Sequence, residues 1–174
     1  MAIYRLEARI IGRTKGGSAY VGRTSVVRMA AYRAGETLRD GQGKTHDFSH
    51  RTDIEAAFLL APDGAPDWAR DRAALWNRVE DTEKRKDAQL AREVLLTLPR
   101  ELTPLQRRAL VTRYVQERFV SQGMIADIGI HNPPASDGGE QPHAHVLLTM
   151  RPLKADGSGF GNKAREWNAF FRWR

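Results

Sequence analysis

The sequence predicts an α/β fold of the α+β sandwich type, with a central, mostly antiparallel β-sheet and helices packed on its faces. Two observations predict this class. Apolar runs typical of strands alternate with stretches of helical periodicity along most of the chain. The last two strands follow one another across a short polar spacer, as in a β-hairpin, so at least these two pair antiparallel.

The first half of the chain contains three segments of regular apolar spacing and one polar loop before a second helix. Thr24 or Ser25 is expected to cap the first helix, and Trp68 and Trp76 to lie on the apolar face of the second, as core residues. The predicted elements are, in order, a strand over residues 2–11, a helix over 24–40, a polar loop over 41–53, a strand over 54–62 and a helix over 65–86.

The second half has clearer boundaries because capping and breaking residues mark them. Thr103 is expected as the N-cap of a helix with Pro104 at its first position and Gly123 at its end. The predicted elements are a central strand over residues 91–99, a helix over 103–123, two strands over 124–131 and 143–150, and a helix from 164.

Composition narrows the class of protein. With 174 residues, 41% of them hydrophobic, the chain is long enough for one core, and we expect residues 1–174 to form a single domain. Twenty-eight Lys and Arg against 21 Asp and Glu, with a pI near 10.1, favour a polyanionic partner such as nucleic acid. No apolar run of membrane-spanning length and no signal-peptide pattern occur, so we expect a cytoplasmic protein without membrane insertion.

The absence of cysteine excludes disulfides, thiolate catalysis and cysteine-type zinc sites, so a metal site here must use His and carboxylates. His143 and His145 lie two residues apart in a predicted strand and therefore point to the same face. His131 ends the preceding strand, and a hairpin would bring its ring to the other two. Three imidazoles arranged in this way suit a divalent metal ion, although imidazole alone does not select one ion. The simpler interpretation is polar residues on a solvated strand face.

Several segments together resemble the N-terminal relaxase domain of MobA/MobL-type (MobQ class) plasmid mobilisation proteins, including TraA-like conjugative relaxases. The segments are "MAIYRLEARIIGR", "SVVRMAAYRAGETL", "DWARDRAALWNRVEDTEKRKDAQLAREVLLTLPREL", "GMIADIGIHNP" and "PHAHVLLTMR". "PHAH" with the upstream "IH" is similar to the three-histidine pattern of the HUH endonuclease superfamily. The resemblance covers nearly the whole chain and implies an HUH endonuclease/relaxase-like fold, with this domain as the N-terminal part of a longer protein.

The resemblance implies a site- and strand-specific DNA transesterase. Such an enzyme nicks one strand at a plasmid transfer origin, stays bonded to the 5′ end through a tyrosine, and can rejoin the strand for plasmid transfer. Tyr32, in "AAYRAGE", matches the nucleophile position, and Tyr20 is its main competitor. The implied cofactor is a divalent ion on His131, His143 and His145, Mg²⁺ or Mn²⁺, with Ni²⁺ or Zn²⁺ as other occupants.

Glu93 matches the acidic position of the same family. It could accept the Tyr32 proton or orient a ligand histidine, and the simpler interpretation is an exposed carboxylate paired with Arg92. Asp127 could share the face of His131, but a structural role is favoured. His46 and His50 are interpreted as solvated polar residues, and Tyr4 and Tyr114 as packing residues.

Basic residues near Tyr32 are expected to follow the DNA backbone. They are Arg13, Lys15, Arg23 and Arg28. The expected partners are single-stranded DNA at the transfer origin and the proteins of the relaxosome and type IV secretion system. We expect a monomer in a bacterial cytoplasm, encoded on a plasmid and able to move to the recipient cell with the DNA.

Three other functions remain open from the sequence. A rolling-circle replication initiator would use the same chemistry, and a non-catalytic DNA-binding module would keep the histidines as structure. A metallohydrolase of small substrates would need neither the positive charge nor the tyrosine.

Overall fold

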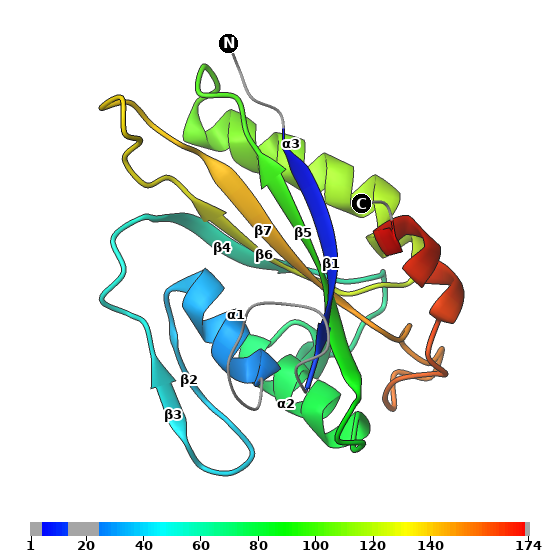
Figure 1. Cartoon of the computed structure of the whole chain (residues 1–174). Coiled ribbons are helices and arrows are strands. Elements are labelled where there is room, and N and C mark those ends of the chain that lie inside the picture. The colour runs from blue at the N-terminus through cyan, green and yellow to red at the C-terminus, as the bar shows by residue number, and fades with distance from the viewer. Residues whose placement is uncertain (1–4, 14–24, 173–174) are drawn as a thin grey trace.

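A five-stranded antiparallel sheet with the strand order β1-β5-β7-β6-β4 forms the centre of the computed structural model, which describes residues 5–13 and 25–172 (Figure 1). The sheet agrees with the mostly antiparallel one expected, and its central pair is the histidine hairpin. Its strands are β1 (Leu6–Gly12), β4 (Ile54–Leu60), β5 (Gln89–Thr97), β6 (Ala126–His131) and β7 (His143–Thr149).

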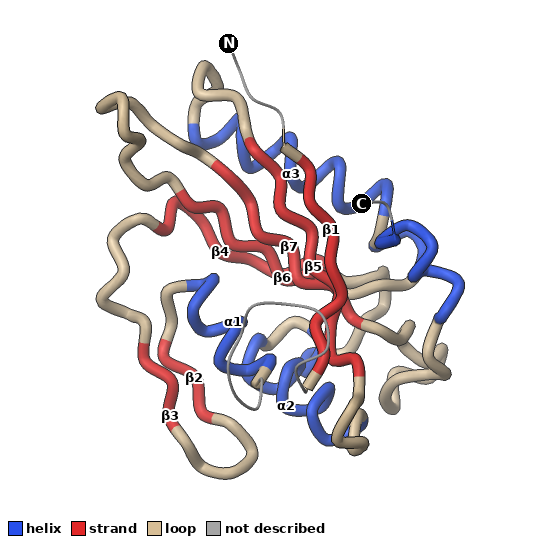
Figure 2. Tube along the Cα trace, viewed as in Figure 1, coloured by secondary structure: helices blue, strands red, loops and turns tan. Residues whose placement is uncertain are grey.

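Helices cover both faces of this sheet (Figures 1 and 2). Helix α3 (Pro104–Arg118) packs on one face, where Val111 and Val115 join a core with Ile128 and Val146 of the central strands. Helices α1 (Val26–Ala34) and α2 (Arg72–Thr82) pack on the other. Alternation along β6 and β7 sends even-numbered residues toward α3 and odd-numbered residues, the three histidines among them, toward the α1 face.

The capping residues behave as the sequence predicts. Ser25 caps α1, since its side chain accepts a hydrogen bond from the backbone N–H of Arg28. Thr103 caps α3 in a reciprocal capping box with Gln106, and Pro104 occupies the first helical position.

The first predicted helix is too long. It ends at Ala34 because Gly35 adopts a left-handed conformation with φ 65° and closes the helix. Leu38, which falls within the predicted helix over residues 24–40, is instead buried in strand β2 (Thr37–Arg39). This strand pairs with β3 (Thr45–Asp47), which lies in the segment predicted as a loop. A spacing of four residues across the glycine imitated helical periodicity.

The second predicted helix is also shorter and is divided in two. A 3-10 turn, η1 (Asp67–Ala69), precedes α2, whose N-cap is Asp71. Trp76 is fully buried in α2, whereas Trp68 lies on η1 and packs edge-on against Phe160 at 5.4 Å between ring centroids.

The remaining helical segments differ in type from the expected α-helices. A separate turn, η2 (Val120–Gln122), follows α3 and ends at Gly123, and the C-terminal stretch forms the 3-10 helix η3 (Arg165–Arg172). Of the helices in residues 5–13 and 25–172, none has the length and hydropathy needed to cross a membrane.

Candidate metal centre and its neighbouring tyrosine

The hairpin of β6 and β7 brings the three predicted histidines together. His131 faces His143 directly in the strand register, and His145 lies two residues further along the same face. The ring centroids are 5.4 Å apart for His131 and His143, 4.8 Å for His131 and His145, and 5.2 Å for His143 and His145. One nitrogen of each ring lies within 4.8 Å of the others, so the three can serve as ligands of one ion.

Each ring also has one nitrogen hydrogen-bonded to an oxygen that can only accept. His131 Nε2 lies 2.7 Å from the carbonyl of Arg33, and His143 Nδ1 lies 2.9 Å from the carbonyl of Gln141. His145 Nδ1 lies 3.0 Å from Glu93 Oε1. In the neutral form of each ring these nitrogens therefore carry the hydrogen, and the remaining nitrogen has the lone pair. This is the arrangement in which neutral imidazole binds a metal.

The surroundings keep two of these rings uncharged near neutral pH. Burial lowers the pKa of His131 to about 4, against the opposing effect of its hydrogen bond to the Arg33 carbonyl. Burial also lowers the pKa of His145, although Glu93 opposes that change. Both rings therefore offer lone pairs at neutral pH.

Glu93 is the polar centre beneath His145. Its side chain is 2% exposed, and it receives hydrogen bonds from Arg33, Arg9 and His145. Burial alone would raise the pKa of this carboxyl, but the bond from His145 and the two guanidinium charges outweigh it and lower the pKa to about 2. Glu93 is thus ionised, with both oxygens engaged.

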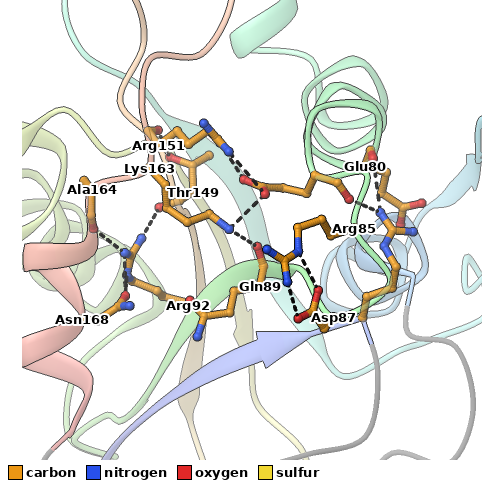
Figure 3. A network of polar contacts seen from close by, with 12 residues as sticks. Glu80, Arg85, Asp87, Gln89, Arg92, Thr149, Arg151, Lys163, Ala164 and Asn168 are labelled. Atoms are coloured by element: carbon orange, nitrogen blue, oxygen red, sulfur yellow. Dashed lines mark hydrogen bonds and ion pairs between the residues drawn. The ribbon is translucent and has the colours of Figure 1, made fainter.

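The interpretation of Glu93 as an exposed partner of Arg92 is wrong. Arg92 follows the alternation of β5 to the opposite face of the sheet. Its guanidinium donates to Asn168 Oδ1 and to the carbonyls of Thr149 and Ala164, as Figure 3 shows.

Arg33 joins helix α1 to the histidines in two ways. Its backbone carbonyl, at the C-terminal end of α1, accepts the hydrogen bond from His131, and its guanidinium binds Glu93, which in turn holds His145. This contact requires a glycine at 129, because a Cβ there would lie 2.3 Å from the Arg33 oxygen. Neither Arg33 nor Gly129 carries a signal in the sequence that could have identified this role.

Tyr32 immediately precedes Arg33, and this residue is 44% exposed at the surface of α1. Its ring meets Phe48 edge-on, with centroids 5.2 Å apart. The guanidinium carbon of Arg51 lies 4.1 Å from the centre of the Tyr32 ring. The predicted nucleophile thus lies on the helix whose end contacts His131.

The basic residues predicted to contact DNA do not behave alike. Arg13 is 7% exposed and donates to the carbonyls of Glu80 and Glu83 at the end of α2. Its buried guanidinium is therefore not available to contact a DNA phosphate, contrary to the prediction. Arg28 is exposed, with its guanidinium 5.5 Å from the ring centre of Phe48. Lys15 and Arg23 lie outside the described residues.

Two of the other candidate polar residues have structural roles. Asp127 is buried and accepts hydrogen bonds from Arg72 and from the indole of Trp76. This agrees with the structural role favoured from the sequence. His46 is not solvated as expected: it is buried in the β2–β3 hairpin and hydrogen-bonded to Asp40 at 2.9 Å.

The remaining histidine and tyrosines fall into two groups. His50 is exposed, and Tyr114 is half-buried edge-on against Phe119. Tyr4 and Tyr20 lie outside the described residues.

Comparison with known proteins places these features in a family context. The model of the MobA/MobL family matches residues 24–169. The chain is 36% identical to a "Conjugal transfer protein TraA" of Agrobacterium fabrum, over 91% of this chain and 14% of that protein. It is 35% identical to a "Mobilization protein MobL" of Acidithiobacillus ferridurans, over 95% of this chain and 47% of that protein. The chain therefore spans less than half of either relative.

A solved structure described as the "Molecular Basis of Vancomycin Resistance Transfer in Staphylococcus aureus" has a closely similar fold. It superposes with a TM-score of 0.80 and 28% identity, over 96% of this chain and 82% of that one. This similarity confirms the α+β, HUH-like fold class.

Proposed function

The chain belongs to the MobA/MobL family, and from this premise we propose that it is a relaxase domain that nicks one DNA strand at a transfer origin. One observation carries the proposal. Two of the three clustered histidines, His131 and His145, are tied through Arg33 to the helix that carries the exposed Tyr32. A small-substrate metallohydrolase would not need that tyrosine.

The residues fit a divalent metal ion. His131, His143 and His145 would hold it through the nitrogens that are not hydrogen-bonded to Arg33, Gln141 and Glu93. When bound, such an ion supplies Lewis-acid stabilisation to a non-bridging oxygen of the scissile phosphate. Imidazole donors suit transition-metal ions better than Mg²⁺, so among the expected ions we favour Mn²⁺ over Mg²⁺. Ni²⁺ and Zn²⁺ are further ions that the same three histidines can bind.

The covalent step assigned to Tyr32 is a transesterification. Its phenol loses a proton to solvent, and the phenolate oxygen attacks the phosphorus of the scissile diester. A new P–O bond forms to Tyr32, the bond to the 3′ oxygen breaks, and that oxygen takes a proton from water. One phosphodiester replaces another, so the reaction is reversible and the strand can be rejoined without another energy source.

Glu93 is assigned as a positioning residue in this proposal. Its carboxylate accepts hydrogen bonds from two arginines and His145, and its pKa is held at about 2, so it is a poor acceptor for a phenol proton. A carboxylate bonded to the far nitrogen of a ligand imidazole fixes the orientation of that ring and increases its basicity. Glu93 thus acts through His145.

The partner of this site in the proposal is single-stranded DNA. The net charge of +7 favours a polyanion, and Arg28 offers an exposed guanidinium one helical turn before Tyr32. Relaxosome and type IV secretion proteins, a cytoplasmic location and a monomeric state remain predictions.

Denaturing electrophoresis tests the function directly. The protein is incubated with Mn²⁺ and labelled single-stranded oligonucleotides tiled across the DNA neighbouring its gene. We expect a covalent adduct for one oligonucleotide, retained by Tyr114→Phe and lost in Tyr32→Phe, although Tyr32→Phe still binds that DNA. Peptide mapping should place the nucleotide on Tyr32. Binding without any adduct would leave a DNA-binding module, and a label on Tyr20 would overturn the assignment of the nucleophile.

A further inference from the structure

We infer that Arg51, held in place by Asp53, is a positioning residue that clamps the phenol ring of Tyr32 for attack. The inference deepens the proposed function and rests on Tyr32 being the nucleophile. Neither Arg51 nor Asp53 is one of the proposed metal ligands His131, His143 and His145.

The contacts of Arg51 define one orientation of its guanidinium. Its Nε donates to Asp53 Oδ1 at 3.0 Å and its Nη2 to Asp53 Oδ2, which makes a two-pronged pair. Its Nη1 donates to the backbone carbonyl of Tyr32 at 2.7 Å. Only 13% of the Arg51 side chain is exposed. Three hydrogen bonds therefore hold its guanidinium group in one orientation.

This orientation places the guanidinium against the Tyr32 ring. The distance of 4.1 Å from the guanidinium carbon to the ring centre is well inside the range of about 6 Å for cation–π attraction. Phe48 meets the same ring edge-on, at an interplanar angle of 90°. An exposed tyrosine on a helix surface ordinarily changes rotamer freely, whereas this ring is held from two directions.

The same segment is anchored beside the metal centre. The carbonyl of Asp53 accepts a hydrogen bond of 2.8 Å from the N–H of Asn132, the residue after His131. Ile54, next in the chain, pairs with His131 in the register of β4 and β6. The clamp therefore fixes the phenol relative to the strand that carries a metal ligand.

The chemistry benefits from such a clamp in two ways. Attack on phosphorus requires the oxygen to be held close to the phosphate and in line, and a displacement of about 1 Å can cost about 100-fold in rate. The ring also gains negative charge when its hydroxyl ionises, and an adjacent cation stabilises that charge. Lysine cannot replace both contacts, because a compact ammonium lacks the planar fork.

The test compares single-turnover rates of adduct formation at saturating DNA with separately measured DNA affinity. The variants are Arg51→Met, Arg51→Lys and Asp53→Asn. Arg85→Met is the matched control, because Arg85 forms the same two-pronged pair with Asp87 at an exposed site. Arg85→Met removes the same charge at a residue to which we assign no role in binding or catalysis.

We expect Arg51→Met to slow the adduct step about 10- to 100-fold relative to Arg85→Met, with similar DNA affinity in both. Arg51→Lys should not restore the rate. Asp53→Asn should also slow the step, even though the lost negative charge leaves DNA affinity equal or higher. Equal rates in Arg51→Met and Arg85→Met, or full rescue by lysine, would overturn the inference.

A measurement without DNA separates positioning from misfolding. In protein labelled with ¹³C-tyrosine, the Tyr32 resonance is identified by its loss in Tyr32→Phe. Arg51→Met should move this resonance and leave that of Tyr114 in place, and an unmoved Tyr32 resonance would contradict the clamp. Adduct formation by Tyr32→Phe would instead overturn the proposed function itself.

Discussion

Substitution of Gly129 by alanine tests whether the packing of α1 on β6 positions the histidines of the candidate metal centre. Gly129 is buried opposite His145 in the hairpin. An added Cβ would lie 2.3 Å from the Arg33 oxygen, 3.0 Å from its carbonyl carbon and 3.1 Å from His131 Nε2. Ordinary contact begins at 3.4 Å, so the helix or the strand must move by about 1 Å. Two of the three contacts are backbone atoms, which no side-chain rotation can relieve.

The sign and size of the effect follow from these distances. Alanine in a strand interior would ordinarily stabilise by about 0.5–1 kcal/mol relative to glycine. Overpacking costs about 1–3 kcal/mol, and loss of the hydrogen bond between His131 and Arg33 costs about 1 kcal/mol more. We therefore expect Gly129→Ala to lower the free energy of unfolding by about 2 kcal/mol. Because His131 loses its orienting partner, metal affinity should fall about 10- to 100-fold.

Urea denaturation and isothermal titration with Mn²⁺ measure the two effects. Gly159→Ala is the control, since a Cβ there meets nothing within 4 Å, and it should change stability by less than about 0.5 kcal/mol. If Gly129→Ala were as stable as the native chain and bound Mn²⁺ equally well, the contact between α1 and the histidine would not support the site.

Two further predictions concern the polar centre. Glu93→Gln should lower Mn²⁺ affinity about 10- to 100-fold yet keep most of the adduct rate at saturating Mn²⁺, whereas loss of that rate would show that Glu93 is the base. The second concerns pH: the folded pKa of His131, about 4, lies below its unfolded value of 6.5, so the unfolded state binds more protons between these values. Urea denaturation in chelator should therefore show about 2 kcal/mol less stability at pH 5 than at pH 7, and His131→Gln should reduce this difference. A stability that stays level over this range would contradict the burial of a neutral ring.

Local patterns in the sequence predicted the parts of the site that depend on one element or on adjacent ones. Strand alternation placed His143 and His145 on one face, and the short spacer predicted the hairpin that brings His131 to them. Side-chain chemistry at helix ends limited the first cap to Thr24 or Ser25, of which the structure uses Ser25, and identified Thr103. These features depend on backbone geometry that repeats every two or 3.6 residues, so they can be predicted from the sequence alone.

Periodicity failed where a single residue overrode it. Leu38 fits the helical stripe of α1, but Gly35 ends the helix and places Leu38 in a strand. Arg13 was assigned to DNA because it lies in a basic segment, yet the packing of β1 beside α2 buries its guanidinium on two backbone carbonyls. Charge in the sequence does not show which charges are already used inside the protein.

By itself, the sequence determined the fold class, the net charge and the three-histidine arrangement, because periodicity and composition record them directly. Only the tertiary structure decided which nitrogen of His131 and which nitrogen of His145 is hydrogen-bonded, since their partners lie 98 and 52 residues away in the chain. The same holds for Arg51 over Tyr32, 19 residues apart across a helix and a hairpin. Such contacts form only when separate helices and strands pack against each other. The spacing of residues along the chain therefore does not predict them.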